Sequence, residues 1–492
     1  MGDDVRFHLQ AQKITMRTFR QKISLSTNSI ERETNFKFMR FIFSILIIAV
    51  CGLSIFARTK TPDFAELEKV IEAELAATKT PGAAVAIVSG DRIIFAKGFG
   101  VTSAEDGREV SAGTLFRMGS TTKMFTAAAL LTLAGQGRLR LDAPVGNYIK
   151  NLPPKIAALT AHQLLSQSSG LRDFAPLASG NDAAALGQNI RLWKDDVFFT
   201  DSDKIYSYSS ANYWLAGFIT EELYGKPYQD AMAELVFKPL GMTRSTTDPL
   251  VAMTYPLALG HSVSGEKAAL VRPIDNNAAK YPGGSMFSSA EELARWSVAM
   301  LNGGRIDGKQ SIPAAVVEKL QKPQFYLPGE EKAFYGYGLL GYEQQGVKTV
   351  SHGGASRGYG SFITFAPEQK IAVVVLANVS GQTLPKTQQK ALEMLLPLKP
   401  APPTAGEEVS APTAGAAELQ KFAGKYEHAP QTWEFFVRGG KLFVKEGGKE
   451  FELKQTGTNE FSYEQGGFLF VPDERGEIEH IFMGLYAARK IS

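Results

Sequence analysis

The sequence predicts an α+β protein in which an antiparallel sheet, built from the two ends of one long domain, is flanked by helices and has a mostly helical insert. Three observations support this prediction. Hairpin-like pairs of strand segments lie near residues 83–96 and again near residues 361–377. The long stretch between them has mostly helical and loop patterns. Short alternating runs punctuated by paired glycines fill the chain from residue 418 to its end, and they predict a small antiparallel β domain.

The first 57 residues have the composition of a targeting region. Residues 1–38 hold 7 basic and 4 acidic residues, and residues 39–57 begin with Met39-Arg40 and continue as the apolar run FIFSILIIAVCGLSIFA. A basic start, an apolar core and a small final residue are typical of a secretory signal peptide. We therefore expect translation to start at Met39, so that residues 1–38 are an upstream extension, and residues 39–57 to direct export.

A membrane anchor is the alternative for the same apolar run. Residues 41–57 reach the lower limit of about 17 residues for a membrane-spanning helix. A signal peptide is favoured, and both alternatives place the rest of the chain in the periplasm, on the outer face of the membrane or in the medium. Val50 before Cys51 disfavours lipid attachment at that cysteine.

The charge and cysteine content exclude several classes of protein. Lys and Arg total 53 against 50 Asp and Glu, and the excess lies in residues 1–38, so no basic field is present to attract nucleic acid. Cys51 is the only cysteine, so cleavage of the leader would leave no disulfide or thiol nucleophile. The 6 histidines show no metal-binding spacing, and we expect neither a metal nor a cofactor. His162 is expected to be a partly exposed helix residue.

The long domain is expected to span residues 62–396. Apolar residues at helical spacing predict a helix over 62–77, and two strands joined by a short turn follow at 83–88 and 92–96. Thr160 and Gln163 have the spacing of a helix capping box. The second pair of strands, 361–365 and 371–377, surrounds the turn PEQK.

Beyond the long domain the composition changes twice. Residues 397–417 are rich in Pro, Ala and Thr and are expected to form a linker. Residues 418–492 contain alternating runs such as KLFVK and GFLFV, and they are expected to form the small β meander or barrel.

The stretch GSTTKMF places Ser120 three residues before Lys123 at the start of a helical run. On a helix these side chains share a face, and the first turn favours developing negative charge. A lysine in a partly desolvated pocket loses its proton more easily and can act as a base for the hydroxyl. A serine cap beside a solvated lysine is the alternative for the motif alone.

Two further segments complete a three-part pattern: YSYSSANYW from Tyr206, and SHGGA from Ser351. With these motifs the sequence resembles the serine β-lactamase and penicillin-binding-protein superfamily, in the branch of class C β-lactamases, D-alanyl-D-alanine peptidases and related esterases. The resemblance covers most of residues 62–396, and it includes the segments FRMGS, GRLRLDAPV, LLSQSSGL and GGSMFS. It implies the β-lactamase-like fold for this domain.

The resemblance also implies a role for each motif residue. Ser120 would be the acylated nucleophile, and Lys123 would help remove its proton. Tyr208 would pass a proton to the leaving group and later activate water, a role that needs positive charge nearby, such as Lys123. The backbone N–H groups of Ser120 and Ala355 would form the oxyanion hole. Without the other motifs, Tyr206, Tyr208 and Tyr213 would be interpreted as buried packing residues.

Three positions depart from the family pattern. Ser210 stands where the second motif has asparagine, and its shorter side chain offers one hydrogen-bonding group fewer. His352-Gly353-Gly354 stands where β-lactamases have Lys-Thr-Gly, which weakens recognition of a substrate carboxylate; Arg357 is interpreted as a solvated surface residue and not as a replacement. Gln167 replaces a histidine of the LLTHTSGL-type segment.

A second serine, Ser356, lies in a literal Gly-x-Ser-x-Gly sequence, GASRG. A nucleophile elbow of this kind needs a strand before it, a helix after it and partner residues downstream. Here the strand-like run SFITF follows, and the downstream histidines His428 and His480 lie beyond the linker. We interpret the match as a chance overlap with the third motif.

We therefore expect an exported, cofactor-free serine hydrolase that forms an acyl-enzyme at Ser120 with an ester, amide or β-lactam carbonyl. Ser210, His352, Gly354 and Ala355 would contact the substrate. The departures at Ser210 and His352 favour an esterase or peptidase over a true β-lactamase. The alternatives are a D-alanyl-D-alanine carboxypeptidase or penicillin-binding protein, and a weakly catalytic binding or sensing protein on the same fold.

Overall fold

The central sheet joins the two ends of the long domain. The computed structural model describes residues 63–492 apart from 106, 174 and 401–413, so the predicted leader, the signal segment with Cys51 and most of the predicted linker lie outside the described residues. In spatial order, the eight strands of the sheet are β2 (Arg92–Gly100), β1 (Gly82–Ser89), β14 (Ile371–Ala377), β13 (Tyr359–Ala366), β12 (Val347–Ser356), β11 (Leu340–Gln344), β10 (Phe334–Tyr335) and β9 (Phe325–Tyr326).

All neighbouring strands of this sheet are antiparallel, and β1 pairs with β14 over its whole length, from Ala83 opposite Ala377 to Ser89 opposite Ile371. The predicted assembly of the sheet from both chain ends is therefore confirmed. Alternate residues of β1 face opposite sides, so that Ala84 and Ala86 join one apolar cluster while Val85 and Ile87 join another.

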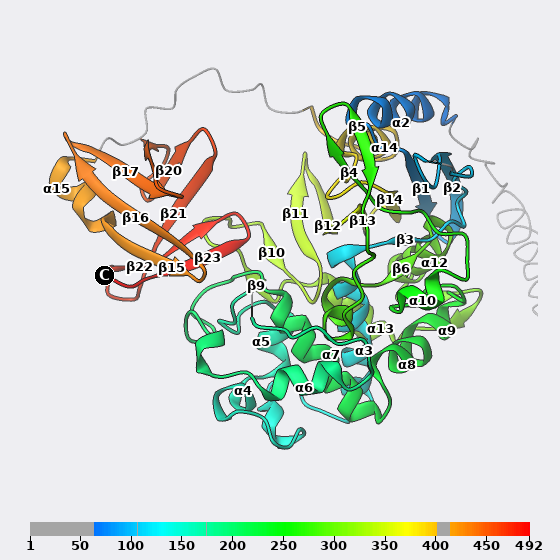
Figure 1. The fold of residues 1–492 in the computed structure, drawn as a ribbon, viewed down its shortest axis with the longest axis horizontal. Coiled ribbons are helices and arrows are strands. Elements are labelled where there is room, and N and C mark those ends of the chain that lie inside the picture. Colours follow the sequence, from blue (N-terminus) through cyan, green and yellow to red (C-terminus); the bar gives the residue numbers. More distant parts are fainter. Residues whose placement is uncertain (1–62, 106, 174, 401–413) are drawn as a thin grey trace, which may run out of the picture. The chain divides into compact units, whose positions relative to one another are not determined.

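Helices cover both faces of the sheet (Figure 1). Helix α2 (Ala65–Thr78) confirms the first predicted helix and packs with α14 (Pro385–Leu395) on one face. The buried carboxylate of Glu74 accepts hydrogen bonds from the backbone N–H groups of Lys386 and Thr387, at 2.9 and 2.7 Å, and so caps the start of α14. Helix α12 (Ala290–Leu301) packs on the opposite face.

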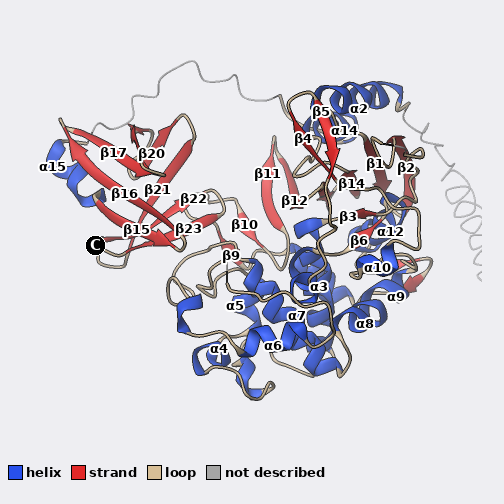
Figure 2. Ribbon diagram, viewed as in Figure 1, coloured by secondary structure: helices blue, strands red, loops and turns tan. Residues whose placement is uncertain are grey.

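The insert between β2 and β9 is mostly helical, as expected, and Figure 2 shows α4 to α8 gathered into a helical region. Thr160 and Gln163 form the predicted capping box at the start of α5. The central helix α3 is buried along nearly its whole length and packs against α7, α11 and α13. Besides α12, the helices of the insert are α3 (Thr122–Gly135), α4 (Pro154–Ala158), α5 (Ala161–Leu165), α6 (Ala185–Arg191), α7 (Ser210–Tyr224), α8 (Tyr228–Met232), α9 (Lys238–Leu240), α10 (Pro249–Ala252), α11 (Tyr281–Gly284) and α13 (Ala314–Gln321).

Short strand pairs and 3-10 turns complete the insert. The pairs are β3 (Phe116–Arg117) with β6 (Phe287–Ser288), β4 (His261–Ser264) with β5 (Lys267–Leu270), and β7 (Arg305–Ile306) with β8 (Lys309–Gln310). Strand β3 leads directly into Ser120 through Met118 and Gly119, so its pairing with β6 helps to fix the nucleophile motif.

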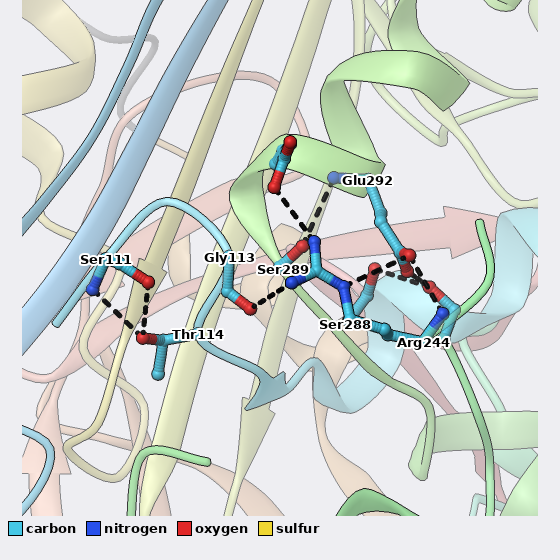
Figure 3. Close-up of polar contacts among 9 residues, drawn as sticks. Ser111, Gly113, Thr114, Arg244, Ser288, Ser289 and Glu292 are labelled. Atoms are coloured by element: carbon cyan, nitrogen blue, oxygen red, sulfur yellow. Dashed lines mark hydrogen bonds and ion pairs between the residues drawn. The ribbon is translucent and has the colours of Figure 1, made fainter. Parts of the chain in front are cut away.

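A polar network supports this β3–β6 pair (Figure 3). The buried carboxylate of Glu292 accepts hydrogen bonds from the backbone N–H of Arg244 at 2.8 Å and from the hydroxyl of Ser245 at 2.6 Å. Ser289 caps α12 by accepting from the Glu292 N–H, and the Arg244 guanidinium donates to the carbonyl of Gly113. Because a buried carboxylate is stable only with such partners, the network holds α12 against the loop before β3.

The C-terminal part forms a second antiparallel sheet of nine strands, which confirms the predicted β meander or barrel. A short helix α15 (Ala416–Leu419) precedes it. In spatial order the strands are β18 (Lys449–Glu452), β17 (Lys441–Glu446), β16 (Gln431–Arg438), β15 (Gly424–His428), β23 (Tyr486–Lys490), β22 (Ile478–Met483), β21 (Gly466–Pro472), β20 (Glu460–Tyr463) and β19 (Lys454–Gln455). Its own aromatic core includes Phe422, Tyr426, Phe435 and Phe470.

Within the described ranges, no helix combines the length and the apolar character that crossing a bilayer requires.

Candidate active site

The nucleophile motif begins in a tight turn against the central sheet. Residues Gly119–Thr121 form a 3-10 turn that continues into α3. Gly119 has φ +57°, and a Cβ at this position would lie 2.7 Å from the carbonyl oxygen of Ala355 on β12. The hydroxyl of Ser361 on β13 donates to the Met118 carbonyl at 2.6 Å. Glycine therefore permits a close approach that sets Ser120 beside the backbone of Ala355.

Lys123 lies one turn behind Ser120, as the spacing predicts. Its Nζ is 3.2 Å from the Ser120 hydroxyl and 3.3 Å from the Ser210 hydroxyl, and it donates to the carbonyl of Gly283 at 2.7 Å. The side chain is completely buried, and this burial lowers the pKa of Lys123 to about 7, although the negative charge of Asp173 opposes the shift. The amine is therefore partly unprotonated near neutral pH and can accept a proton from Ser120.

Tyr208 approaches the same serine from the extended segment before α7. Ser120 is near enough to its hydroxyl to act on the pKa of Tyr208, and the Tyr208 ring centroid is 4.8 Å from the Lys123 Nζ. Burial nevertheless raises the pKa of Tyr208 well above its ordinary value. Burial thus outweighs the opposing effect of Ser120, and Tyr208 stays protonated and able to donate a proton.

Ser210 is the first residue of α7, and its hydroxyl is within hydrogen-bonding distance of Lys123. Its backbone N–H donates to the Oδ1 of Asp173 at 2.6 Å. The side chain that replaces the family's asparagine is thus directed toward the lysine.

His352 lies on β12 and is neutral. Its Nδ1 donates to the carbonyl of Gly353 at 2.6 Å, which leaves Nε2 to accept from the hydroxyl of Tyr335 at 3.3 Å. Burial, and secondarily the charge of Lys123, lower the pKa of His352 to about 3. Its ring centroid is 6.0 Å from that of Tyr208. At this position the site therefore presents an uncharged imidazole and no ammonium group.

Gly354 and Ala355 follow on the same strand. A Cβ at position 354 would lie 1.9 Å from the Met118 carbonyl oxygen, so only glycine lets β12 pass the nucleophile turn at this distance. Ala355 is exposed on the side of Ser120. The structure thus brings together every site residue that the sequence predicted.

The rival serine is in a different environment. Ser356 ends β12 and is joined to β13 by a turn, so a strand and not a helix follows it, as the sequence analysis expects. Arg357 is exposed, in keeping with its interpretation as a surface residue. His162 is partly buried and its Nδ1 lies 2.8 Å from the hydroxyl of Tyr337, which accounts for it without a metal.

Sequence reasoning did not identify the role of Gln167. Its side-chain oxygen accepts from the backbone N–H of Ser209 at 2.9 Å and from the amide of Asn212 at 2.5 Å, and its backbone carbonyl accepts from the N–H of Ser207 at 3.0 Å. Gln167 therefore holds the segment that carries Tyr208. Its replacement of the family's histidine was the available signal.

The sequence left open whether the C-terminal β domain binds a partner or shields the active site, and it did not show the contacts of this domain with the tyrosine segment. At the turn between β22 and β23, the carbonyl of Leu485 accepts from the backbone N–H of Tyr208 at 2.8 Å, and the N–H of Ala487 donates to the hydroxyl of Ser207 at 3.1 Å. The Tyr486 ring centroid is 6.0 Å from that of Tyr208. The turn therefore forms one wall beside the candidate catalytic tyrosine.

Known proteins share this architecture. The family model described as Beta-lactamase matches residues 67–395. Protein flp of Staphylococcus aureus is 27% identical over 332 residues, which are 65% of this chain and 64% of that protein, so the chain spans under two thirds of this relative. Penicillin-binding protein 4 of Amycolatopsis lactamdurans is 28% identical over 311 residues, which cover 61% of this chain and 81% of the relative.

A solved structure extends the likeness in fold beyond the matched region. The octameric penicillin-binding protein homologue from Pyrococcus abyssi superposes with a TM-score of 0.59 at 24% identity, and the match covers 87% of this chain and all of that one. Residues 67–395 hold the nucleophile motif, the tyrosine segment and the third motif, and the family model matches all of them. The chain therefore belongs to the β-lactamase family, within the superfamily of serine β-lactamases and penicillin-binding proteins.

Proposed function

We propose that this protein is an exported serine hydrolase that forms an acyl-enzyme at Ser120 with an ester, amide or β-lactam carbonyl. One observation carries the proposal: the Lys123 amine, with its pKa lowered to about 7, lies 3.2 Å from the Ser120 hydroxyl. A base whose pKa is near the working pH and within hydrogen-bonding reach is what nucleophilic catalysis by serine requires.

Acylation begins when Lys123 takes the proton of Ser120 while the oxygen attacks the substrate carbonyl carbon. The carbonyl electron pair moves to the oxygen, where the N–H groups of Ser120 and Ala355 stabilise the negative charge. When the tetrahedral intermediate collapses, the bond to the leaving group breaks. Tyr208, protonated because it is buried, gives its proton to the leaving group and recovers one from the Lys123 ammonium.

Deacylation repeats these steps with water. A water molecule loses a proton to Lys123 through Tyr208, and its oxygen attacks the acyl carbon. The bond to Ser120 then breaks, and the serine oxygen takes up the proton.

The neutral His352 favours an ester or peptide-like substrate over a β-lactam. β-Lactams and D-alanyl-D-alanine peptides carry a carboxylate, and an uncharged imidazole offers it no ion pair. The alternative, a D-alanyl-D-alanine carboxypeptidase or penicillin-binding protein, is supported by the relatives that are named as penicillin-binding proteins. Export through residues 39–57 is part of this proposal and rests on the sequence alone.

The test compares wild type with Ser120→Ala and Ser356→Ala, using a fluorophosphonate and a panel of chromogenic ester, cephalosporin and D-amino peptide substrates. Ser356→Ala is the matched control because its serine lies on the same strand as His352. We expect Ser120→Ala to lose labelling and at least about 10³-fold in turnover, because nucleophile and base act as a unit. Ser356→Ala should keep both.

Two outcomes would contradict the proposal. Labelling that survives in Ser120→Ala but disappears in Ser356→Ala would reassign the nucleophile. Wild-type protein that is neither labelled nor active on any substrate class would instead favour a binding protein on the same fold.

A further inference from the structure

The fixed charges around Ser120 are unusual for a site that would bind a carboxylate. His352 is neutral, and Lys123 is deeply buried and directed to Ser120, Ser210 and Gly283. A carboxylate, that of Asp173, instead lies at the edge of the site. Its Oδ1 is 2.6 Å from the backbone N of Ser210, whose hydroxyl is 3.3 Å from the Lys123 Nζ.

Asp173 forms no salt bridge within the part of the chain that the structure describes, although Lys123 is near enough to interact with its charge. The neighbouring cation, Arg172, is directed away from it to Glu427 on β15, at 3.3 Å. Asp173 is partly exposed, and its negative charge opposes the lowering of the Lys123 pKa by burial and adds to the raising of the Tyr208 and Tyr486 pKa values by burial. The carboxylate therefore lies within electrostatic reach of Lys123 and of both tyrosines.

Contacts from the C-terminal sheet and from the long domain both hold the backbone around Asp173 in place. Its backbone N–H donates to Nε2 of His428 at 3.3 Å, and Nδ1 of His428 donates to the carbonyl of Ala487 at 2.7 Å. On the other side, the hydroxyl of Ser209 donates to the carbonyl of Arg172 at 2.9 Å. These contacts fix the segment before any substrate arrives, which is the property expected of a recognition residue.

The aromatic ring of Tyr486 lies near Asp173. Tyr486, the first residue of β23, is 37% exposed, and its ring centroid is 6.5 Å from that of His428, the residue that holds the Asp173 backbone. Its other neighbour is the ring of Tyr208. A carboxylate together with an aromatic face is the usual combination for binding an organic ammonium group.

We propose that Asp173, with the ring of Tyr486, binds a positively charged ammonium group of the substrate, so that the preferred acyl donors are amino-acid-type esters and amides with a free amine near the scissile carbonyl. This inference rests on the proposed acyl transfer at Ser120 and names its substrate class. The alternative for Asp173 is a purely structural role, in which it only accepts the first N–H of α7.

Asp173→Asn separates the two roles because an asparagine oxygen still accepts the Ser210 N–H but carries no charge. Asp182→Asn is the matched control: Asp182 is exposed and accepts a backbone N–H from Ala184 at 2.9 Å. The probes are 4-nitrobenzyl esters of alanine, as both enantiomers, and of isobutyric acid, in which a methyl group replaces the ammonium.

For wild type we expect kcat/KM to favour the better alanine enantiomer over the isobutyrate by about tenfold or more, since charge-assisted contacts contribute most of the discrimination. Asp173→Asn should lower kcat/KM for the alanine ester by about 10- to 100-fold more than for the isobutyrate, mainly through KM, because loss of the charge also acts on Lys123 and so affects both esters. Tyr486→Leu, which removes the ring, should weaken the same preference less strongly. Asp182→Asn should behave as wild type.

Equal losses on both esters in Asp173→Asn would overturn the proposal and leave Asp173 as a structural cap. Fluorophosphonate labelling of Ser120 without selective hydrolysis of the alanine ester would overturn this proposal alone. Absence of both labelling and hydrolysis in wild type would overturn the proposed function and this inference together.

Discussion

Lys123→Met is expected to abolish acylation, lowering kcat/KM by about 10³- to 10⁴-fold, because it removes the only base within reach of Ser120 in our mechanism. Methionine matches the buried stem of lysine and keeps the packing of α3. In wild type, kcat/KM should rise as the pH increases through about 7, since the unprotonated amine is the reactive form. The residual kcat/KM of Lys123→Met should not show this rise near pH 7. Pre-steady-state release of a chromogenic leaving group measures both.

Lys123→Met should also make the free energy of unfolding less dependent on pH. The folded pKa of Lys123, about 7, lies below the ordinary lysine value of 10.5, so the folded protein binds fewer protons between these two pH values. The free energy of unfolding must therefore rise with pH across this window in wild type, and less so in Lys123→Met. If Lys123→Met folds and its acylation rate stays within about tenfold of that of wild type, Lys123 is not the base.

Gly354→Ala should be nearly as damaging, although it leaves every catalytic side chain in place. The added Cβ would lie 1.9 Å from the Met118 carbonyl oxygen and 2.4 Å from the Ser361 hydroxyl, so β12 and the nucleophile turn must separate. Because Ala355 moves with β12, the N–H groups of Ser120 and Ala355, which we propose bind the oxyanion, would lose their alignment. We expect kcat to fall by about 10²- to 10³-fold and the free energy of unfolding to fall by about 1–3 kcal/mol.

Gly353→Ala is the control for this prediction. A Cβ at position 353 would meet only the ring of Phe362, at 3.2 Å, and a ring edge can shift where a backbone carbonyl cannot. Gly353→Ala should therefore have a much smaller effect on kcat. Steady-state kinetics and thermal unfolding of both variants provide the comparison, and equal effects at the two positions would contradict the close-approach argument.

Much of the site could be predicted because its chemistry is carried by side chains in local motifs. The three-residue spacing of Ser120 and Lys123 determines that they share a face, and the structure places their reactive atoms 3.2 Å apart. The hairpin patterns at both ends of the long domain similarly indicated the sheet, whose central pairing joins β1 to β14. Periodicity and turn residues suffice for elements of this kind.

The remaining parts of the site depend on contacts that leave no local pattern. The Leu485 carbonyl accepts a hydrogen bond from the Tyr208 N–H, although the two residues are 277 positions apart in the sequence. A backbone hydrogen bond of this kind does not depend on side-chain identity. Asp173 caps α7 from a different segment, so the residues around Ser210 give no sign of it. The direction of the Tyr208 pKa shift also required the structure, because burial is its largest cause and the sequence does not give the degree of burial.

The most direct test of the account is to identify the residue that becomes covalently modified. Wild-type protein is treated with a fluorophosphonate at pH 8, digested, and the modified peptide is sequenced by tandem mass spectrometry. We expect a single adduct on the serine of the peptide containing GSTTK, and we expect it to form much more slowly in Lys123→Met. An adduct on Ser356, or labelling that is equally fast in Lys123→Met, would contradict the assignment of Ser120 and Lys123 as nucleophile and base.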